Sequence, residues 1–200
     1  MERSRWRFGR GFGQAGKMNV DRYLQRISCP RPHRADLDGL RAIHRAHLRT
    51  IPYENLDVQL QRPLTIEPSA AYEKIVERNR GGWCYEMNGL LGWALGELGY
   101  RVTRATGAVR RDVFGELSVG NHLVLRIDMD EGVFLADTGF GDGPHDPFRI
   151  APGQFSDGRF TYELTREEGS WWRFHNAPRG GGADTFDFSP IPADEKLFAE

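Results

Sequence analysis

The hydrophobic pattern changes its period after Gly99, and this change constrains the fold more than any other feature of the sequence. Before Gly99, apolar residues recur every three or four positions, most clearly over residues 84–98, as on one face of a helix. After Tyr100, short runs alternate between apolar and polar residues and are separated by clusters of Gly, Asp and Pro. The sequence therefore predicts an α+β protein with a helical first half and a β-rich second half.

Each half contains several candidate elements. Helices are expected over residues 20–27, 40–48, 70–79 and 84–98. Strands are expected over residues 101–111, 121–128, 133–137, 159–164, 171–174 and 185–188, as an antiparallel sheet or small β-barrel. Gly89, Gly92 and Gly96 would each cost the last helix about 1 kcal/mol relative to Ala, so we infer close packing against a neighbouring element. The expected domains are a helical domain over residues 18–99 and a β-barrel domain over residues 100–200.

Composition excludes several classes of protein. The 27 Lys and Arg residues nearly balance the 28 Asp and Glu residues, so a broad basic face for nucleic acid is not expected. No segment approaches the roughly 20 apolar residues of a membrane-spanning helix. Cys29 and Cys84 cannot form a disulfide framework or a four-ligand zinc site. The chain is expected to be cytoplasmic, and no pattern specifies its oligomeric state.

Two further patterns are expected to carry no chemistry. Residues 1–17 are basic and glycine-rich, and either a disordered extension or an upstream start that precedes Met18 is favoured over a targeting segment. Their G-x-G-x-x-G spacing is a chance match, because no strand precedes it. His44 and His47 lie one helical turn apart, but no third ligand is evident. Packed, hydrogen-bonded histidines are therefore favoured over a metal site, and no metal is expected.

Cys84 is the candidate nucleophile. It follows Gly81, Gly82 and Trp83 and opens a predicted helix, where exposed backbone N–H groups stabilise negative charge on a thiol. The paired glycines also allow the backbone to approach a ligand closely. The alternative is a small buried apolar residue, as most free cysteines are.

A thiolate nucleophile needs an imidazole partner, which in turn needs a carboxylate. The strands expected on either side of a turn near Asp130 place His122 and Asp137 opposite each other, or one step apart. The glycine-rich turn after Asp137 includes Gly139 and Gly141, whose N–H groups could bind the diphosphate of a cofactor. Ordinary turn chemistry explains the same residues equally well.

These motifs resemble those of the arylamine N-acetyltransferases. RGGWCYEMN over residues 80–88 and ADTGFGDG over residues 136–143 are similar to two family signatures, and His122 lies between them as the family histidine does. Segments 44–48 and 51–57 extend the resemblance, which covers residues 18–190. It implies a helical bundle and a β-barrel in the layout of papain-like and transglutaminase-like enzymes, with the family's third α/β lid domain missing.

The resemblance also implies roles for individual residues. It makes Cys84 the acyl-accepting nucleophile, His122 its base and Asp137 the residue that orients the base. Further residues match the acceptor pocket (Tyr53, Val109 and Phe140), a structural ion pair behind the site (Glu54 and Arg80) and supporting positions (Glu86 and Asn88).

The implied reaction transfers an acetyl group from acetyl-coenzyme A to a small arylamine, hydrazine or arylhydroxylamine through an acetyl-cysteine. Three alternatives stay open. An amide synthase that closes a polyketide macrocycle shares the same motifs. A cysteine protease shares the Cys-His-Asp order but lacks the flanking motifs. A truncated, non-catalytic relative would also keep the three residues.

Overall fold

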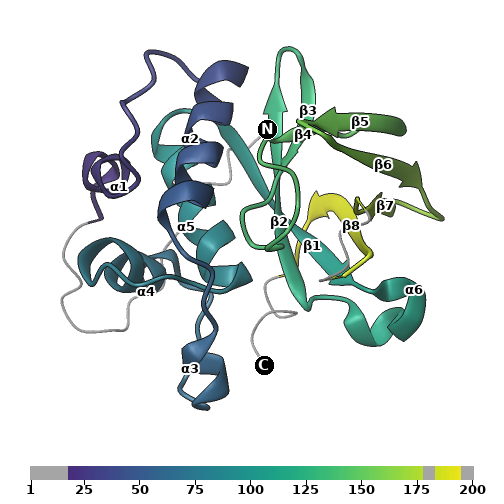
Figure 1. The fold of residues 1–200 in the computed structure, drawn as a ribbon, viewed down its shortest axis with the longest axis horizontal. Coiled ribbons are helices and arrows are strands. Elements are labelled where there is room, and N and C mark those ends of the chain that lie inside the picture. The colour runs from purple at the N-terminus through teal and green to yellow at the C-terminus, as the bar shows by residue number, and fades with distance from the viewer. Residues whose placement is uncertain (1–17, 178–182, 195–200) are drawn as a thin grey trace.

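The computed structural model describes residues 18–177 and 183–194, so the predicted basic extension of residues 1–17 lies outside the described residues. Figure 1 shows most of the helices gathered on one side of a strongly curled antiparallel sheet. The helix that begins at Cys84 lies beside the first two strands of this sheet. The helical first half and the β-rich second half are therefore confirmed.

The predicted helices all form. The helices of the first half are α1 (Val20–Arg26), α2 (Leu37–Thr50), α3 (Leu56–Gln59), α4 (Pro68–Tyr72), the π-helical segment η1 (Glu73–Glu77) and α5 (Cys84–Glu97). Asn19 caps α1 through its side-chain oxygen, and Asp36 caps α2 in the same way. The helix predicted over residues 70–79 is in fact α4 continuing into η1. The short helix α3 was not predicted, because a single turn carries no periodic signal.

The second half forms one antiparallel sheet. Its strands are β1 (Arg101–Val109), β2 (His122–Met129), β3 (Gly132–Ala136), β4 (Phe148–Arg149), β5 (Gly153–Asp157), β6 (Phe160–Arg166), β7 (Trp172–His175) and β8 (Thr185–Pro192). Their spatial order is β4-β3-β2-β1-β8-β7-β6-β5. The connection from β1 to β2 carries α6 (Arg111–Phe114) and the 3-10 helix η2 (Gly115–Ser118).

The predicted antiparallel sheet is confirmed, but the described strands form a half-barrel, because β4 and β5 are the two edges of the described sheet and share no backbone ladder. The sheet curls until Phe148 of β4 stacks on Phe155 of β5, with ring centroids 4.8 Å apart. Aromatic packing thus takes the place of hydrogen bonds at the seam, and the sheet is a half-barrel. The two edge strands were missed because both lie in a segment rich in Gly and Pro.

Two apolar clusters hold this arrangement together. The first joins the helices to the sheet, and includes Leu40, Ile43 and Leu91 with Leu125 and Ile127 of β2. The second fills the curl of the sheet with aromatic side chains, among them Tyr162, Phe174, Phe186 and Phe188. Cys84, Tyr85 and Leu123 form a small third cluster between them. The candidate nucleophile therefore lies where the helices meet the sheet.

The glycines of α5 differ in their surroundings. A Cβ atom at Gly92 would lie 3.0 Å from Cδ2 of Leu125, so this glycine does allow α5 to approach β2 closely. At Gly89 the nearest atom would be 3.6 Å away, an ordinary contact. At Gly96 nothing lies within 4 Å. The inference of close packing is therefore confirmed for Gly92 and wrong for Gly96.

Substitution at these two positions should have opposite effects on stability. Gly96→Ala should raise the free energy of unfolding by about 1 kcal/mol, because Ala favours the helix and its methyl group meets no other atom. Gly92→Val should lower it by roughly 1–3 kcal/mol, because the new side chain presses on Leu125 in a close-packed core. Urea denaturation measures both, with Gly96→Val as the matched control. Equal effects of Val at the two positions would contradict this packing.

Candidate active site

Cys84 is held at the start of α5 by a second chain segment that passes beside it. The N–H of Gly82 donates to the carbonyl of Pro52 at 3.2 Å, and the N–H of Glu54 donates to the carbonyl of Gly82 at 2.9 Å. A Cβ atom at Gly81 would collide with the same Pro52 carbonyl. The sequence suggested that the paired glycines let the backbone approach a ligand. In the structure they instead make room for the backbone of a neighbouring segment of this chain, at Pro52.

An ionic cluster fixes this segment against the first turn of α5. Glu86 accepts from the N–H of Trp83 at 3.1 Å and from Nζ of Lys74 at 2.7 Å. Lys74 also lies 2.9 Å from Asp57, and Arg80 lies 2.7 Å from Glu54, which confirms the predicted Glu54–Arg80 pair. Lys74 is the buried member of this cluster, so removing its carboxylate partners would leave a buried charge uncompensated.

His122 and Asp137 do meet, although not in the predicted register. Leu125 pairs with Ala136, so continuing the ladder places Asp137 opposite Val124, two residues from His122. Residues related in this diagonal way share one face of a sheet and remain within reach of each other. Nε2 of His122 lies 2.7 Å from Oδ2 of Asp137, and the two side chains are only 2% and 5% exposed.

The imidazole of His122 is packed from several sides. Its neighbour in β1 is Gly107, where a Cβ atom would lie 3.0 Å from Cδ2 of the ring. Phe140 and Phe186 approach the ring edge-on, with centroids 6.1 and 5.6 Å away. The role of Gly107 was not predicted, although a glycine inside a strand does signal close approach of another group.

The electrostatics of the pair favour an ionised site. Burial alone would lower the pKa of His122, but the charge of Asp137 and hydrogen bonds with Asp137 and Cys84 raise it to about 10. Burial would raise the pKa of Asp137, but the positive charge and hydrogen bond of His122 hold it below its usual value. Because Nε2 is bonded to Asp137, Nδ1 is the nitrogen left for Cys84. A cation in this position favours the thiolate form of a cysteine.

Asn88, in the second turn of α5, connects all three parts of the site. Its Nδ2 donates to the carbonyl of Leu123 at 2.6 Å and to Oδ1 of Asp137 at 2.7 Å. Its Oδ1 accepts from the N–H of Thr138 at 2.8 Å and from the Thr138 hydroxyl at 3.1 Å. The side chain is fully buried, so every hydrogen bond it can make is used inside the protein.

Gly139, the first glycine of the turn after Asp137, packs against Cys84 and is hydrogen-bonded to Asp137. The N–H of Gly139 donates to Oδ1 of Asp137 at 2.8 Å, so it is not free to bind a phosphate as the sequence suggested. A Cβ atom on Gly139 would lie 2.7 Å from Cα of Cys84. Gly141 has a φ of +96° and open space around it. Its part in cofactor binding stays a prediction.

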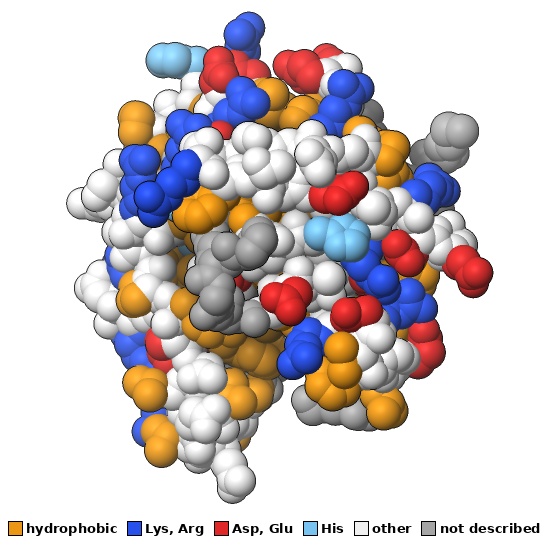
Figure 2. All heavy atoms as spheres, turned by 45° about the vertical axis from the view of Figure 1, so that its right-hand side comes forward, with side chains coloured by type: hydrophobic (Ala, Val, Ile, Leu, Met, Phe, Trp, Pro, Cys, Tyr) orange, Lys and Arg blue, Asp and Glu red, His pale blue; other side chains and the backbone are white. Residues whose placement is uncertain are grey.

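The predicted pocket residues lie on both sides of the triad. Phe140 and the half-buried Val109 pack against the aromatic cluster of the curled sheet, next to His122. Burial and the adjacent Cys84 raise the pKa of Tyr53, whose side chain is 49% exposed beside the nucleophile. Further exposed apolar side chains surround α3 and α6: Leu56, Leu60, Leu64, Val113, Phe114 and Leu117. In Figure 1, α3 and α6 lie in the lower part of the molecule, and Figure 2 shows hydrophobic side chains there.

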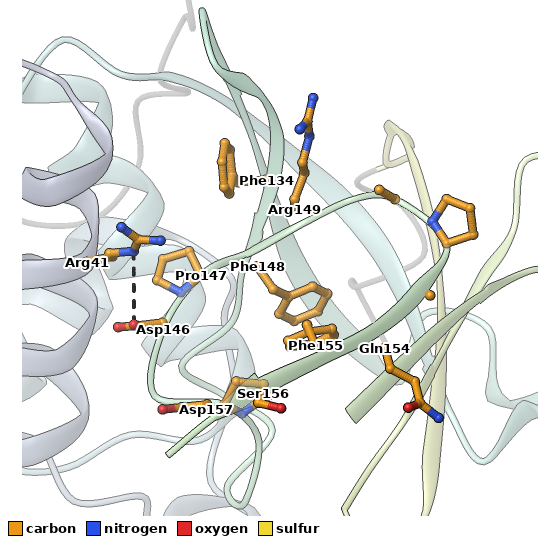
Figure 3. A pocket seen from close by; sticks show the side chains of 14 residues that line it. Arg41, Phe134, Asp146, Pro147, Phe148, Arg149, Gln154, Phe155, Ser156 and Asp157 are labelled. Atoms are coloured by element: carbon orange, nitrogen blue, oxygen red, sulfur yellow. Dashed lines mark ion pairs between the residues drawn. The ribbon is translucent and has the colours of Figure 1, made fainter. Parts of the chain in front are cut away.

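A surface pocket of about 350 Å³ lies elsewhere, between α2 and the β4–β5 region. Figure 3 shows Phe148 and Phe155 at its centre and Arg41 facing Asp146 at one side. Cys84, His122 and Asp137 do not line it.

The described residues contain no group of His, Cys, Asp and Glu that could hold a metal ion. No described helix is long and apolar enough to cross a membrane.

The curled sheet, the cysteine at the start of α5 and the His122–Asp137 pair describe the fold and the candidate site, and known proteins share the sequence of this chain. A family model described as N-acetyltransferase matches residues 36–200. The arylamine N-acetyltransferase of Mycolicibacterium smegmatis is 41% identical over 156 residues, which cover 74% of this chain and 57% of the relative. The liver isozyme of Gallus gallus is 38% identical over 133 residues, covering 64% and 45%.

Solved structures agree with the sequence comparison. The arylamine N-acetyltransferase of Mycobacterium marinum in complex with CoA superimposes with a TM-score of 0.80 at 31% identity, covering 90% of this chain and 69% of that one. The chain therefore belongs to the N-acetyltransferase family. It spans about half the length of the curated relatives it matches.

Gly139→Ala should disturb the nucleophile directly. The added methyl group must displace the backbone of Cys84, so we expect a loss of roughly 1–3 kcal/mol in stability and slower alkylation of Cys84 by iodoacetamide. Gly143→Ala is the matched control in the same turn, because its Cβ atom would lie 3.4 Å from Phe140, an ordinary contact. Thermal unfolding and labelling rates measure both variants. Identical behaviour would show that the turn can shift away without affecting Cys84.

Asp137→Asn should change the pH dependence of Cys84. The substitution removes the charge that raises the pKa of His122 and leaves the burial that lowers it. The imidazolium is then lost at neutral pH, and with it the positive charge beside the Cys84 thiol. We expect the midpoint for Cys84 alkylation to move to higher pH, and the rate below the midpoint to fall at least about tenfold. An unchanged pH profile would mean that Asp137 does not control the charge of His122.

Proposed function

We propose that this chain transfers an acetyl group from acetyl-coenzyme A to a small arylamine, hydrazine or arylhydroxylamine through an acetyl-Cys84 intermediate. The observation that carries the proposal is the buried contact of His122 with Asp137, 2.7 Å from Nε2 to Oδ2, next to Cys84 at the start of α5. Relatives named arylamine N-acetyltransferases support the substrate class, and a relative solved in complex with CoA supports the donor. The two described cysteines are free thiols, in keeping with a cytoplasmic location.

In the first step, the Cys84 thiolate attacks the carbonyl carbon of the thioester and forms a tetrahedral intermediate. This intermediate collapses by breaking the bond to the sulfur of coenzyme A. The leaving thiolate takes a proton from the His122 imidazolium, so free coenzyme A departs and acetyl-Cys84 remains with a neutral imidazole. Asp137 lowers the energy of the imidazolium form at the start and orients the ring throughout.

In the second step, the neutral His122 accepts a proton from the amine as its nitrogen attacks acetyl-Cys84. The Cys84 thiolate then leaves, which restores the thiolate–imidazolium pair and releases the acetylated amine. Phe140, Val109 and Tyr53 are the proposed contacts of the acceptor ring, since aromatic and aliphatic surfaces bind planar aromatic groups. Gly141 is the proposed contact of the coenzyme A diphosphate.

Mass spectrometry tests the proposal directly. Incubation with acetyl-coenzyme A should add one acetyl group to Cys84, and an added arylamine should remove it and appear as the acetylated product. Cys84→Ser should abolish turnover. Cys29→Ala is the matched control and should keep it, because Cys29 is buried in the helical core. A folded protein whose Cys84 stays unmodified would indicate a non-catalytic relative.

A further inference from the structure

The buried face of α2 carries a histidine that the proposed reaction does not use. His44 is 1% exposed, and both of its ring nitrogens have partners. Nδ1 lies 2.7 Å from the carbonyl oxygen of His145, and Nε2 lies 3.2 Å from the backbone nitrogen of Asp137. A carbonyl can only accept and an amide N–H can only donate. The ring is therefore neutral, with its proton on Nδ1 and its Nε2 accepting from Asp137.

The backbone of Asp137 needs this acceptor because of its position. The ladder between β2 and β3 ends at Ala136, so the N–H of the next residue has no partner in the sheet. A buried donor left without a partner typically costs about 1–3 kcal/mol. The Asp137 carboxylate is meanwhile held by three donors, on His122, Asn88 and Gly139. His44 thus fixes the main chain at the point from which the carboxylate reaches His122.

Neighbouring contacts of α2 hold the same loop at a second point. Arg45 makes two hydrogen bonds of 2.5 Å to the carboxylate of Asp146, and Arg41 lies 4.0 Å from it. Figure 3 shows the Arg41 and Asp146 side chains facing each other across the gap between α2 and the loop. The segment that follows the triad aspartate is therefore held against α2 by both its backbone and its side chains.

The charges around His44 are compatible with an accepting ring. Burial lowers the pKa of His44, and the neighbouring carboxylates of Asp137 and Asp146 offset this only in part. His47, one turn further along α2, is also buried, and its pKa is lowered to about 3. Its Nδ1 lies 2.8 Å from the Tyr23 hydroxyl, so it contacts the helical core and no part of the triad.

We propose that His44 is a positioning residue of the active site: by accepting the backbone N–H of Asp137 it sets the orientation of the carboxylate that binds His122. This inference rests on the proposed function, because it assigns His44 a part in forming the Cys84 nucleophile. It links the helical half of the chain to the pair carried by the sheet.

Two amide variants separate the two hydrogen bonds of His44. In His44→Gln, the amide occupies the place of Nε2 and can still accept from Asp137. In His44→Asn, it occupies the place of Nδ1, so it can donate to His145 but cannot reach Asp137. His47→Asn is the matched control on the same helix. The measurement is the rate of Cys84 alkylation by iodoacetamide as a function of pH, with thermal unfolding recorded for each variant.

We expect His44→Asn to move the alkylation midpoint upward by about one pH unit, which is about a tenfold lower rate below the midpoint. His44→Gln should stay close to wild type, and His47→Asn should lose only stability. A wild-type profile in His44→Asn, or equal shifts in both His44 variants, would overturn the inference. A wild-type Cys84 with no enhanced reactivity at neutral pH would instead overturn the proposed nucleophile.

A measurement on the unmodified protein covers the case in which the variants do not fold. Nitrogen-15 NMR of the wild-type histidines should show His44 protonated on Nδ1 and unprotonated on Nε2 across the neutral pH range. The amide of Asp137 should also exchange slowly with solvent, as a buried hydrogen-bonded N–H does. The opposite tautomer, or a protonated His44 ring, would overturn the inference without any substitution.

Discussion

The candidate site depends on the hydrogen bonds of the Asn88 side-chain amide. From one buried side chain on α5 it bonds the strand that carries His122, the carboxylate of Asp137 and the backbone of the following turn. The three candidate residues come from three separate segments: Asn88 bonds to two of these segments and lies one turn after Cys84 on the third, α5. Such a fully satisfied polar network inside a low-dielectric core is rigid and specifies a single arrangement.

This network also makes a buried ion pair tolerable. Removing two charges from water is costly unless the remaining hydrogen-bonding capacity of both groups is satisfied. Oδ1 of Asp137 accepts from Asn88 and Gly139, and Oδ2 meets His122 at 2.7 Å. With three donors on its carboxylate, Asp137 stays ionised while buried. That is why burial fails to keep His122 neutral, although burial acts on both groups.

Local patterns in the sequence predicted much of this arrangement. The helix from Cys84, the strands around His122 and the meeting of His122 with Asp137 all followed from period and turn position. The predicted pairing of His122 directly with Asp137, or one step away, was wrong. The turn between β2 and β3 pairs Met129 with Gly132, and this places Asp137 two residues from His122 along the ladder. The parts that were missed are contacts between distant segments: the ring of His44 on Asp137, Gly107 beneath His122, and Lys74 behind Glu86. No local pattern reports which distant segments will touch.

Close packing around the nucleophile suggests why the chemistry needs the whole fold. Gly139 leaves no room between its turn and the backbone of Cys84, and Gly81 leaves none between α5 and the segment at Pro52. Cys84 is thus confined from the sheet side and from the helical side at once. In the proposed reaction, a cysteine held this firmly loses little orientational freedom when it attacks a carbonyl, and preorganisation of this kind can lower a barrier by several kcal/mol. Two residues without side chains, Gly81 and Gly139, are enough to allow both contacts.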